Sequence, residues 1–208
     1  MKQKTQQKKY ESGFTLVELL AVIAIMMVVG GTVVIGFIGQ RNARNLLIAR
    51  NETVTNIRKV QAYALSSKTL PSDVGAMEGA KYYILTFTQD ENSYTIEALN
   101  TDYQLREVEE INLPHNIFVS RLRTSQGGAD AGWMQVIVGV PFGSMYIRDS
   151  ENCGDDCITP IGSVLSDPIK VARLSQGAVT LEFQSESAGG DPRSFQISPL
   201  TGQILSEQ

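Results

Sequence analysis

The chain has 208 residues, of which 42% are hydrophobic and 19% are charged, so it can form one folded domain in addition to a terminal segment. Its formal net charge of −4 at pH 7 disfavours nucleic acid as a partner, because a polyanion needs a basic surface. Two cysteines permit a single disulfide within the chain.

The chain opens with a basic leader and an apolar helix. Residues 1–13 contain four lysines and one glutamate, whereas Glu18 is the only ionisable residue between Phe14 and Ile38. A helix of this length, at about 1.5 Å per residue, exceeds the roughly 30 Å hydrocarbon core of a bilayer. The preceding lysines favour a cytoplasmic N-terminus, and no A-x-A-like signal cleavage site follows. Residues 14–39 are therefore predicted to be a transmembrane helix.

Four glycines in or next to this run allow two interpretations. They permit close packing or local unwinding in a helical assembly, or they represent the ordinary glycine content of membrane helices. The sequence does not separate these interpretations. The residues are Gly30, Gly31, Gly36 and Gly39.

Helical periodicity continues over residues 40–70, which are predicted to be an amphipathic helix ending near Ser67. The chain has no proline before Pro71. The apolar side of this helix needs a partner surface, which the rest of the chain must supply. The apolar positions assigned to that side are Leu47, Val54, Ile57, Val60, Ala64 and Leu65.

Residues 71–208 are predicted to form a β-rich head. Residues 71–79 have the composition of a loop, and alternating apolar residues then predict a hairpin of strands 82–88 and 93–99. With no second helix predicted, the head should be antiparallel and the fold class α+β. Further strands are predicted at 106–111, 117–123, 133–140, 144–148, 169–174, 179–184, 194–197 and 203–205.

The two cysteines lie in an acidic segment, residues 149–157, which has three interpretations. Cys153 and Cys157 could form a disulfide in an oxidising compartment, remain free thiols in a redox role, or bind a metal. For zinc, a second ligand pair is missing and the only histidine, His115, is distant in sequence. For calcium, the carboxylates lack the spacing of an EF-hand loop. The prediction for this segment is a disulfide and no metal site.

The sequence offers no catalytic constellation. It contains no G-x-S-x-G elbow, no second histidine to pair with His115, and no nucleotide-binding loop. Trp133 is most simply a core residue or an interface anchor. We therefore predict no catalytic residues, no cofactor and no enzymatic activity.

The segment Gly13-Phe14-Thr15-Leu16-Val17-Glu18, after a basic leader and before a long apolar helix, resembles the prepilin signal of type IV pilins and type II secretion pseudopilins. The resemblance implies that a membrane aspartyl peptidase cuts between Gly13 and Phe14 and that Phe14 is then N-methylated. It also implies that Glu18 pairs with the Phe14 amine of a neighbouring subunit during filament assembly. A carboxylate inside an apolar helix either has such a partner, because an unpaired one costs at least a few kcal/mol, or snorkels to the edge of the membrane.

The head resembles the H-type (FimT-like) minor pseudopilins in short patches at residues 111–114, 138–143 and 195–202. That resemblance implies two sheets packed on the helix. DNA-binding relatives carry basic residues around the C-terminal glycine turn, whereas residues 201–208 contain no arginine or lysine. A DNA-uptake role is therefore disfavoured.

These observations predict a structural subunit, a minor pilin or pseudopilin, of a type IV pilus or a type II secretion pseudopilus. The implied partners are other pilin subunits, the prepilin peptidase/N-methyltransferase and the inner-membrane assembly platform. The expected location is the bacterial inner membrane, with a single span and the head outside, and later the extracytoplasmic filament. The alternatives are an uncleaved, membrane-anchored extracytoplasmic binding module and a subunit of a competence pilus.

Overall fold

The structure is a computed structural model that describes residues 15–71, 77–124, 130–151, 153, 160–167, 177–186, 191–198 and 203–205. Within these ranges the side chains of residues 33–39, 70–71 and 77–78 are not described. The chain divides into two units, Met1–Gln40 and Arg41–Gln208, each of which is described by itself.

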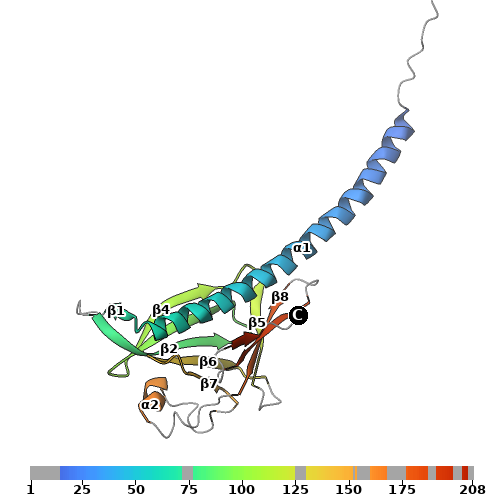
Figure 1. The fold of residues 1–208 in the computed structure, drawn as a ribbon. Helices are drawn as coiled ribbons and strands as arrows, with labels where there is room; N and C mark the ends of the chain where they lie inside the picture. The colour runs from blue at the N-terminus through green and yellow to red at the C-terminus, as the bar shows by residue number, and fades with distance from the viewer. Residues whose placement is uncertain are drawn as a thin grey trace, which may run out of the picture. The chain divides into compact units, whose positions relative to one another are not determined.

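One helix, α1, runs from Leu16 to Leu65 (Figure 1). It confirms the helix predicted from the N-terminal sequence, and it continues without a break through the glycines at 30, 31, 36 and 39. In the described part of the chain, no helix reaches the length and apolarity required to cross a membrane. The membrane span predicted for residues 14–39 is not confirmed.

The end of α1 is a Schellman motif. The amide of Lys68 donates to the carbonyl of Tyr63 at 3.1 Å, and the amide of Ser67 donates to that of Ala64 at 3.2 Å. Ser67 adopts the left-handed conformation, with φ of 49°, that this motif requires. The chain therefore leaves the helix with its last carbonyls satisfied.

The head contains two antiparallel sheets. The six-stranded sheet has the order β4-β3-β2-β6-β7, with β1 paired to β2, and the four-stranded sheet has the order β10-β9-β8-β5. The strands of the first sheet are β1 (Thr69–Pro71), β2 (Met77–Thr88), β3 (Ser93–Asn100), β4 (Leu105–Asn112), β6 (Trp133–Gly139) and β7 (Met145–Asp149). Those of the second are β5 (Ile117–Thr124), β8 (Val179–Ser185), β9 (Arg193–Ser198) and β10 (Gln203–Leu205).

The main core joins the C-terminal part of α1 to both sheets. Alternate residues of β2 point toward this core and are fully buried, as a two-residue period requires. On α1 the buried residues follow a spacing of three or four, so they lie along one side of the helix. These helix residues are Leu46, Ala49, Thr53, Ile57, Val60 and Ala64.

This buried stripe differs in part from the predicted one. Leu47 and Leu65 are 40% and 63% exposed, whereas Leu46 and Ala49 are completely buried. Neighbouring leucines at 46 and 47 fit a helical period almost equally well, and only packing against the sheets decides between them.

A second, smaller core covers the other face of the six-stranded sheet. There Ile84, Leu99 and Ile137 pack against a short helix, α2 (Ile161–Leu165). The prediction of no second helix was wrong, because five residues are too few to show helical periodicity. The six-stranded sheet is therefore covered by apolar contacts on both faces.

Most strands predicted from the sequence are confirmed to within a few residues, but the predicted loop 71–79 was wrong at both ends. Thr69 pairs with Gly79 and Pro71 with Met77, which creates β1 and extends β2. This pairing joins backbone groups and needs no apolar alternation, so the sequence pattern did not reveal it. The predicted strand 169–174 lies outside the described residues.

Phe87→Ala tests the main core. Phe87 is fully buried, and its ring centroid lies 4.8 Å from that of Tyr94. The variant should lose about 3–5 kcal/mol of unfolding free energy, because it removes apolar contact and leaves a cavity. The measurement is denaturant unfolding of the full chain in detergent, followed by the fluorescence of Trp133.

The matched control is Phe142→Ala. Phe142 is 86% exposed, so the change should stay within about 0.5 kcal/mol. Equal losses of unfolding free energy in the two variants would contradict the burial of Phe87.

Candidate functional site

The start of α1 is closed by a capping box formed by Thr15 and Glu18. The amide of Glu18 donates to Thr15 Oγ1 at 3.3 Å. In return, Glu18 Oε2 accepts from the amide and the hydroxyl of Thr15, both at 3.4 Å. The carboxylate therefore lies at the positive end of the helix dipole, where negative charge is favoured.

The sequence contained a signal for this cap, because Thr15-x-x-Glu18 before an apolar run is the pattern of a capping box. The prediction for Glu18 concerned only a contact between subunits, so the role of Thr15 was missed. Gly13 and Phe14 lie outside the described residues. The cleavage site at Gly13 and Phe14 and the assembly role of Glu18 remain predictions.

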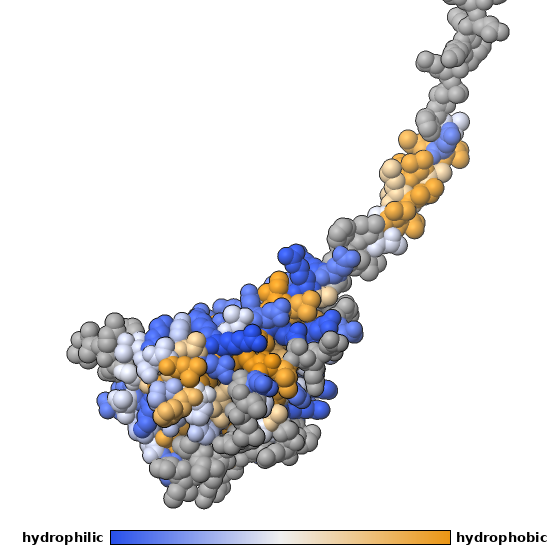
Figure 2. All heavy atoms as spheres, viewed as in Figure 1, coloured by the Kyte–Doolittle hydropathy of each residue, from blue (hydrophilic) through white to orange (hydrophobic). Residues whose placement is uncertain are grey.

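The helix surface that follows is apolar on all sides. Large apolar side chains from Leu16 to Val29 are 42–75% exposed, and Figure 2 shows them along this part of α1. Apart from the adjacent residues and the nearby backbone of the same helix, no described atom lies within 4 Å of a Cβ built on Gly30 or Gly31. A helix that is apolar all round requires an apolar environment, so this surface is suited to contacts beyond its own chain.

The acidic segment after β7 provides one disulfide-bonded cysteine. Cys153 is in a disulfide, and Cys157 lies outside the described residues, so the predicted pairing remains a prediction. Asp149 is 1% exposed and accepts a hydrogen bond from the amide of Glu151 at 2.9 Å. Among the described residues no group of three potential ligands could hold a metal ion.

The two other residues singled out in the sequence, His115 and Trp133, belong to the unit Arg41–Gln208. His115 is exposed in the turn between β4 and β5. Trp133 begins β6 and is half-buried, and the guanidinium of Arg148 lies 5.3 Å from its ring centroid. Because Trp133 precedes Ile137 by four residues on β6, strand alternation places it on the face of the six-stranded sheet that packs against α2.

A row of polar side chains crosses four strands on that face. Arg148 Nη1 donates to Gln135 Oε1 at 3.2 Å, and Gln135 Nε2 donates to Thr86 Oγ1 at 3.3 Å. The hydroxyl of Thr86 donates in turn to Glu97 Oε2 at 3.3 Å. Burial raises the pKa of Glu97 and repulsion by Glu107 adds to this, whereas the hydrogen bond from Thr86 lowers it. The register of the strands brings these side chains together, and no sequence motif predicts the row.

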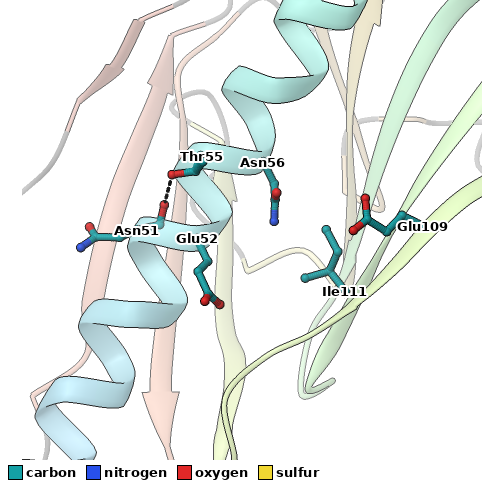
Figure 3. A pocket seen from close by; sticks show the side chains of 6 residues that line it. All are labelled: Asn51, Glu52, Thr55, Asn56, Glu109 and Ile111. Carbon is teal, nitrogen blue, oxygen red and sulfur yellow. Dashed lines mark hydrogen bonds between the residues drawn. The ribbon is translucent and has the colours of Figure 1, made fainter.

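A groove lies between α1 and the edge strand β4, with a volume of about 400 Å³. In Figure 3, Asn56 and Ile111 point into the gap from opposite sides. Lys59 Nζ contacts Glu109 Oε2 at 2.7 Å across the same interface, and this hydrogen bond raises the pKa of Lys59. The groove is lined by Asn51, Glu52, Thr55, Asn56, Glu109 and Ile111.

The family described as the prokaryotic N-terminal methylation motif matches residues 8–34 of the chain. The matched segment includes Gly13, Phe14 and Glu18, and it supports the type IV pilin and pseudopilin family. The motif indicates a pilin-like subunit that is processed by prepilin peptidase, and this family is structural rather than enzymatic. The comparisons with curated proteins and with solved structures found no match. The H-type subfamily is not confirmed.

Glu97→Gln tests the polar row through pH. Because burial raises the pKa of Glu97 above its ordinary value of 4.5, the folded chain binds this proton more tightly than the unfolded chain. The resulting stability is fully present below pH 4.5 and is lost as pH rises through the folded pKa. The variant should have the same free energy of unfolding as the parent below pH 4.5 and a larger one at pH 7. Denaturant unfolding under these two conditions measures the difference.

The control is Glu110→Gln, which removes an exposed carboxylate from β4. Its stability relative to the parent should change much less between the two pH values. A gain for Glu97→Gln that is the same at both pH values would be inconsistent with the raised pKa.

Proposed function

We propose that the chain is a minor pilin or pseudopilin that is processed at its N-terminus and assembled into a type IV pilus or a type II secretion pseudopilus. The observation that carries this proposal is the match of the N-terminal methylation motif to residues 8–34. The α+β architecture, a long helix followed by an antiparallel head, is consistent with such a subunit.

In this proposal the precursor is held in the bacterial inner membrane by residues 14–39, with the N-terminus in the cytoplasm and the head outside. Two features support this placement, the first of them also its orientation. Four lysines precede the apolar segment, and large apolar side chains are exposed on α1 from Leu16 to Val29. Lipid surrounds these side chains before assembly, and neighbouring helices surround them afterwards.

Cleavage between Gly13 and Phe14 creates an amine on Phe14, next to Thr15. We place the carboxylate of Glu18 opposite the Phe14 amine of a neighbouring subunit. The interaction is strong because charges attract more in a medium of low dielectric constant, and loss of either partner strands the other charge. The capping box supports this role, since it holds the carboxylate at the helix start in the isolated subunit.

The head is outside the cytoplasm in this proposal, where a disulfide between Cys153 and Cys157 can persist. Two observations support the pairing: Cys153 is disulfide-bonded, and the chain contains two cysteines in total. The loop that this disulfide would close contains the three residues between the cysteines, so the entropic gain is small, about 2 kcal/mol or less.

Mass spectrometry of the chain purified from its native membranes tests the processing. The mature N-terminus should be Phe14 carrying a methyl group. Gly13→Leu should leave the leader attached, because the peptidase requires a small residue at the cut. An intact leader on the parent chain would instead identify an uncleaved membrane anchor, and a processed Gly13→Leu product would place the cut elsewhere.

Two substitutions at Glu18 separate its charge from its capping role. Glu18→Ala should be processed normally but should enter filaments poorly. Glu18→Gln keeps a capping acceptor without the charge, and it should show the same assembly defect, about tenfold or more in the sheared filament fraction.

Glu11→Ala is the matched control, because it removes the leader carboxylate that cleavage discards. It should assemble like the parent. Normal assembly of Glu18→Gln would show that the charge of Glu18 is not required and would overturn the pairing.

A further inference from the structure

We propose that the groove between α1 and β4 is an acidic docking surface that receives Arg58 from a second copy of this chain. The inference rests on the proposed function as a filament subunit and adds a specific contact between heads. It concerns residues that lie entirely within the unit Arg41–Gln208.

The groove is negatively charged and open to solvent. Glu52 extends from α1 and is exposed, and Glu109 on β4 has 44% of its side chain exposed although it binds Lys59. Figure 3 shows both carboxylates at the sides of the gap, with Ile111 pointing toward the helix. Glu107 and Glu110 on the same strand are exposed but do not line the groove, so Glu52 and Glu109 supply its carboxylates. This combination of a carboxylate rim and an apolar wall suits a long cationic side chain.

Arginine fits this site better than lysine does. Its planar guanidinium can donate two parallel hydrogen bonds to one carboxylate, while its methylene stem can pack on an apolar residue such as Ile111. The exposed amide of Asn51 adds a polar group at the rim, whereas Asn56 Nδ2 already donates to the hydroxyl of Tyr94 at 2.9 Å.

The complementary charge is carried by the same helix. Between Arg41 and Leu65, α1 has five basic residues and a single acidic one, Glu52. Arg58 is exposed. At about 100° and 1.5 Å per residue, Arg58 lies about 120° around the helix from Glu52 and about 9 Å further along. The acidic groove and its basic complement therefore occupy different sides of one molecule.

Two complementary patches on different sides of a molecule produce a heterologous contact. Such contacts do not close into a dimer. They generate an open helical assembly when the rotation that relates one subunit to the next does not close into a ring. A parallel neighbour displaced by about 9 Å along the helix axis brings its Arg58 to the level of Glu52. The geometry is therefore suited to a growing filament.

Strand addition at the free edge of β4 is a weaker use of the same surface. β4 ends the order of the six-stranded sheet, but it carries Glu107, Glu109 and Glu110, and its register with β3 shifts between Ile96 and Glu97. Charges and register irregularities of this kind protect edge strands from pairing. A side chain that enters the groove avoids both obstacles.

Charge exchange in the full chain, expressed in its native membranes, tests the contact. Glu52→Arg and Arg58→Glu should each lower the sheared filament fraction about fivefold or more, since each replaces attraction by repulsion. The double variant Glu52→Arg/Arg58→Glu should return to within about twofold of the parent, because it restores the pair in reversed order.

The matched control is Glu52→Arg/Arg44→Glu. Arg44 is also exposed on α1 but lies at a different level of the helix, so this pair should not be rescued. Normal assembly of either single variant, or equal rescue by the control, would overturn the proposal. Restoration by the double variant also shows that the single variants did not fail through misfolding.

Mass spectrometry of the same samples distinguishes this inference from the proposed function. An unprocessed N-terminus in every sample would reject the pilin-type function itself. If Phe14 is methylated and the charge-exchange variants assemble like the parent, only the groove contact is rejected.

Discussion

The head depends on the burial of one stripe of α1 between two sheets. Leu46, Ala49, Ile57, Val60 and Ala64 are completely buried in a core to which both sheets contribute. At about 25 cal/mol per Å² of buried apolar surface, this contact is the main favourable term that holds helix and sheets together. On the other face of the six-stranded sheet, Ile84, Leu99 and Ile137 are buried against α2.

The two parts of α1 obtain their stability from different sources. Residues 41–65 pack one side against the head of the same chain, and the side chains exposed on the other sides are mainly polar, with Leu47 and Leu65 as apolar exceptions. From Leu16 to Val29 the large apolar side chains are exposed, and the helix is supported within the chain by its backbone bonds and the Thr15–Glu18 cap. A helix of this kind is completed by partners outside the chain, which is the physical basis for an assembly role.

Charge is distributed in a way that suits the same role. The helix segment within the head is basic and β4 is acidic, and Lys59 and Glu109 already join them within one subunit at 2.7 Å. Exposed pairs of this kind contribute little each, about 1 kcal/mol or less, but a filament repeats the contact at every subunit. Weak complementary surfaces can therefore determine how subunits are arranged without adding much to the stability of one head.

The sequence by itself determined the features that depend on neighbouring residues: the helix, most strands, the alternating core positions and the N-terminal motif. It also contained the Thr15-x-x-Glu18 cap. Tertiary structure alone decided which leucine of the pair 46–47 is buried, because helical period permits either. It also decided the contacts between distant segments: α2 on the second face, the row from Arg148 to Glu97, and the groove between Glu52 and Glu109. These contacts depend on strand register and helix placement, which arise only when segments far apart in sequence pack together.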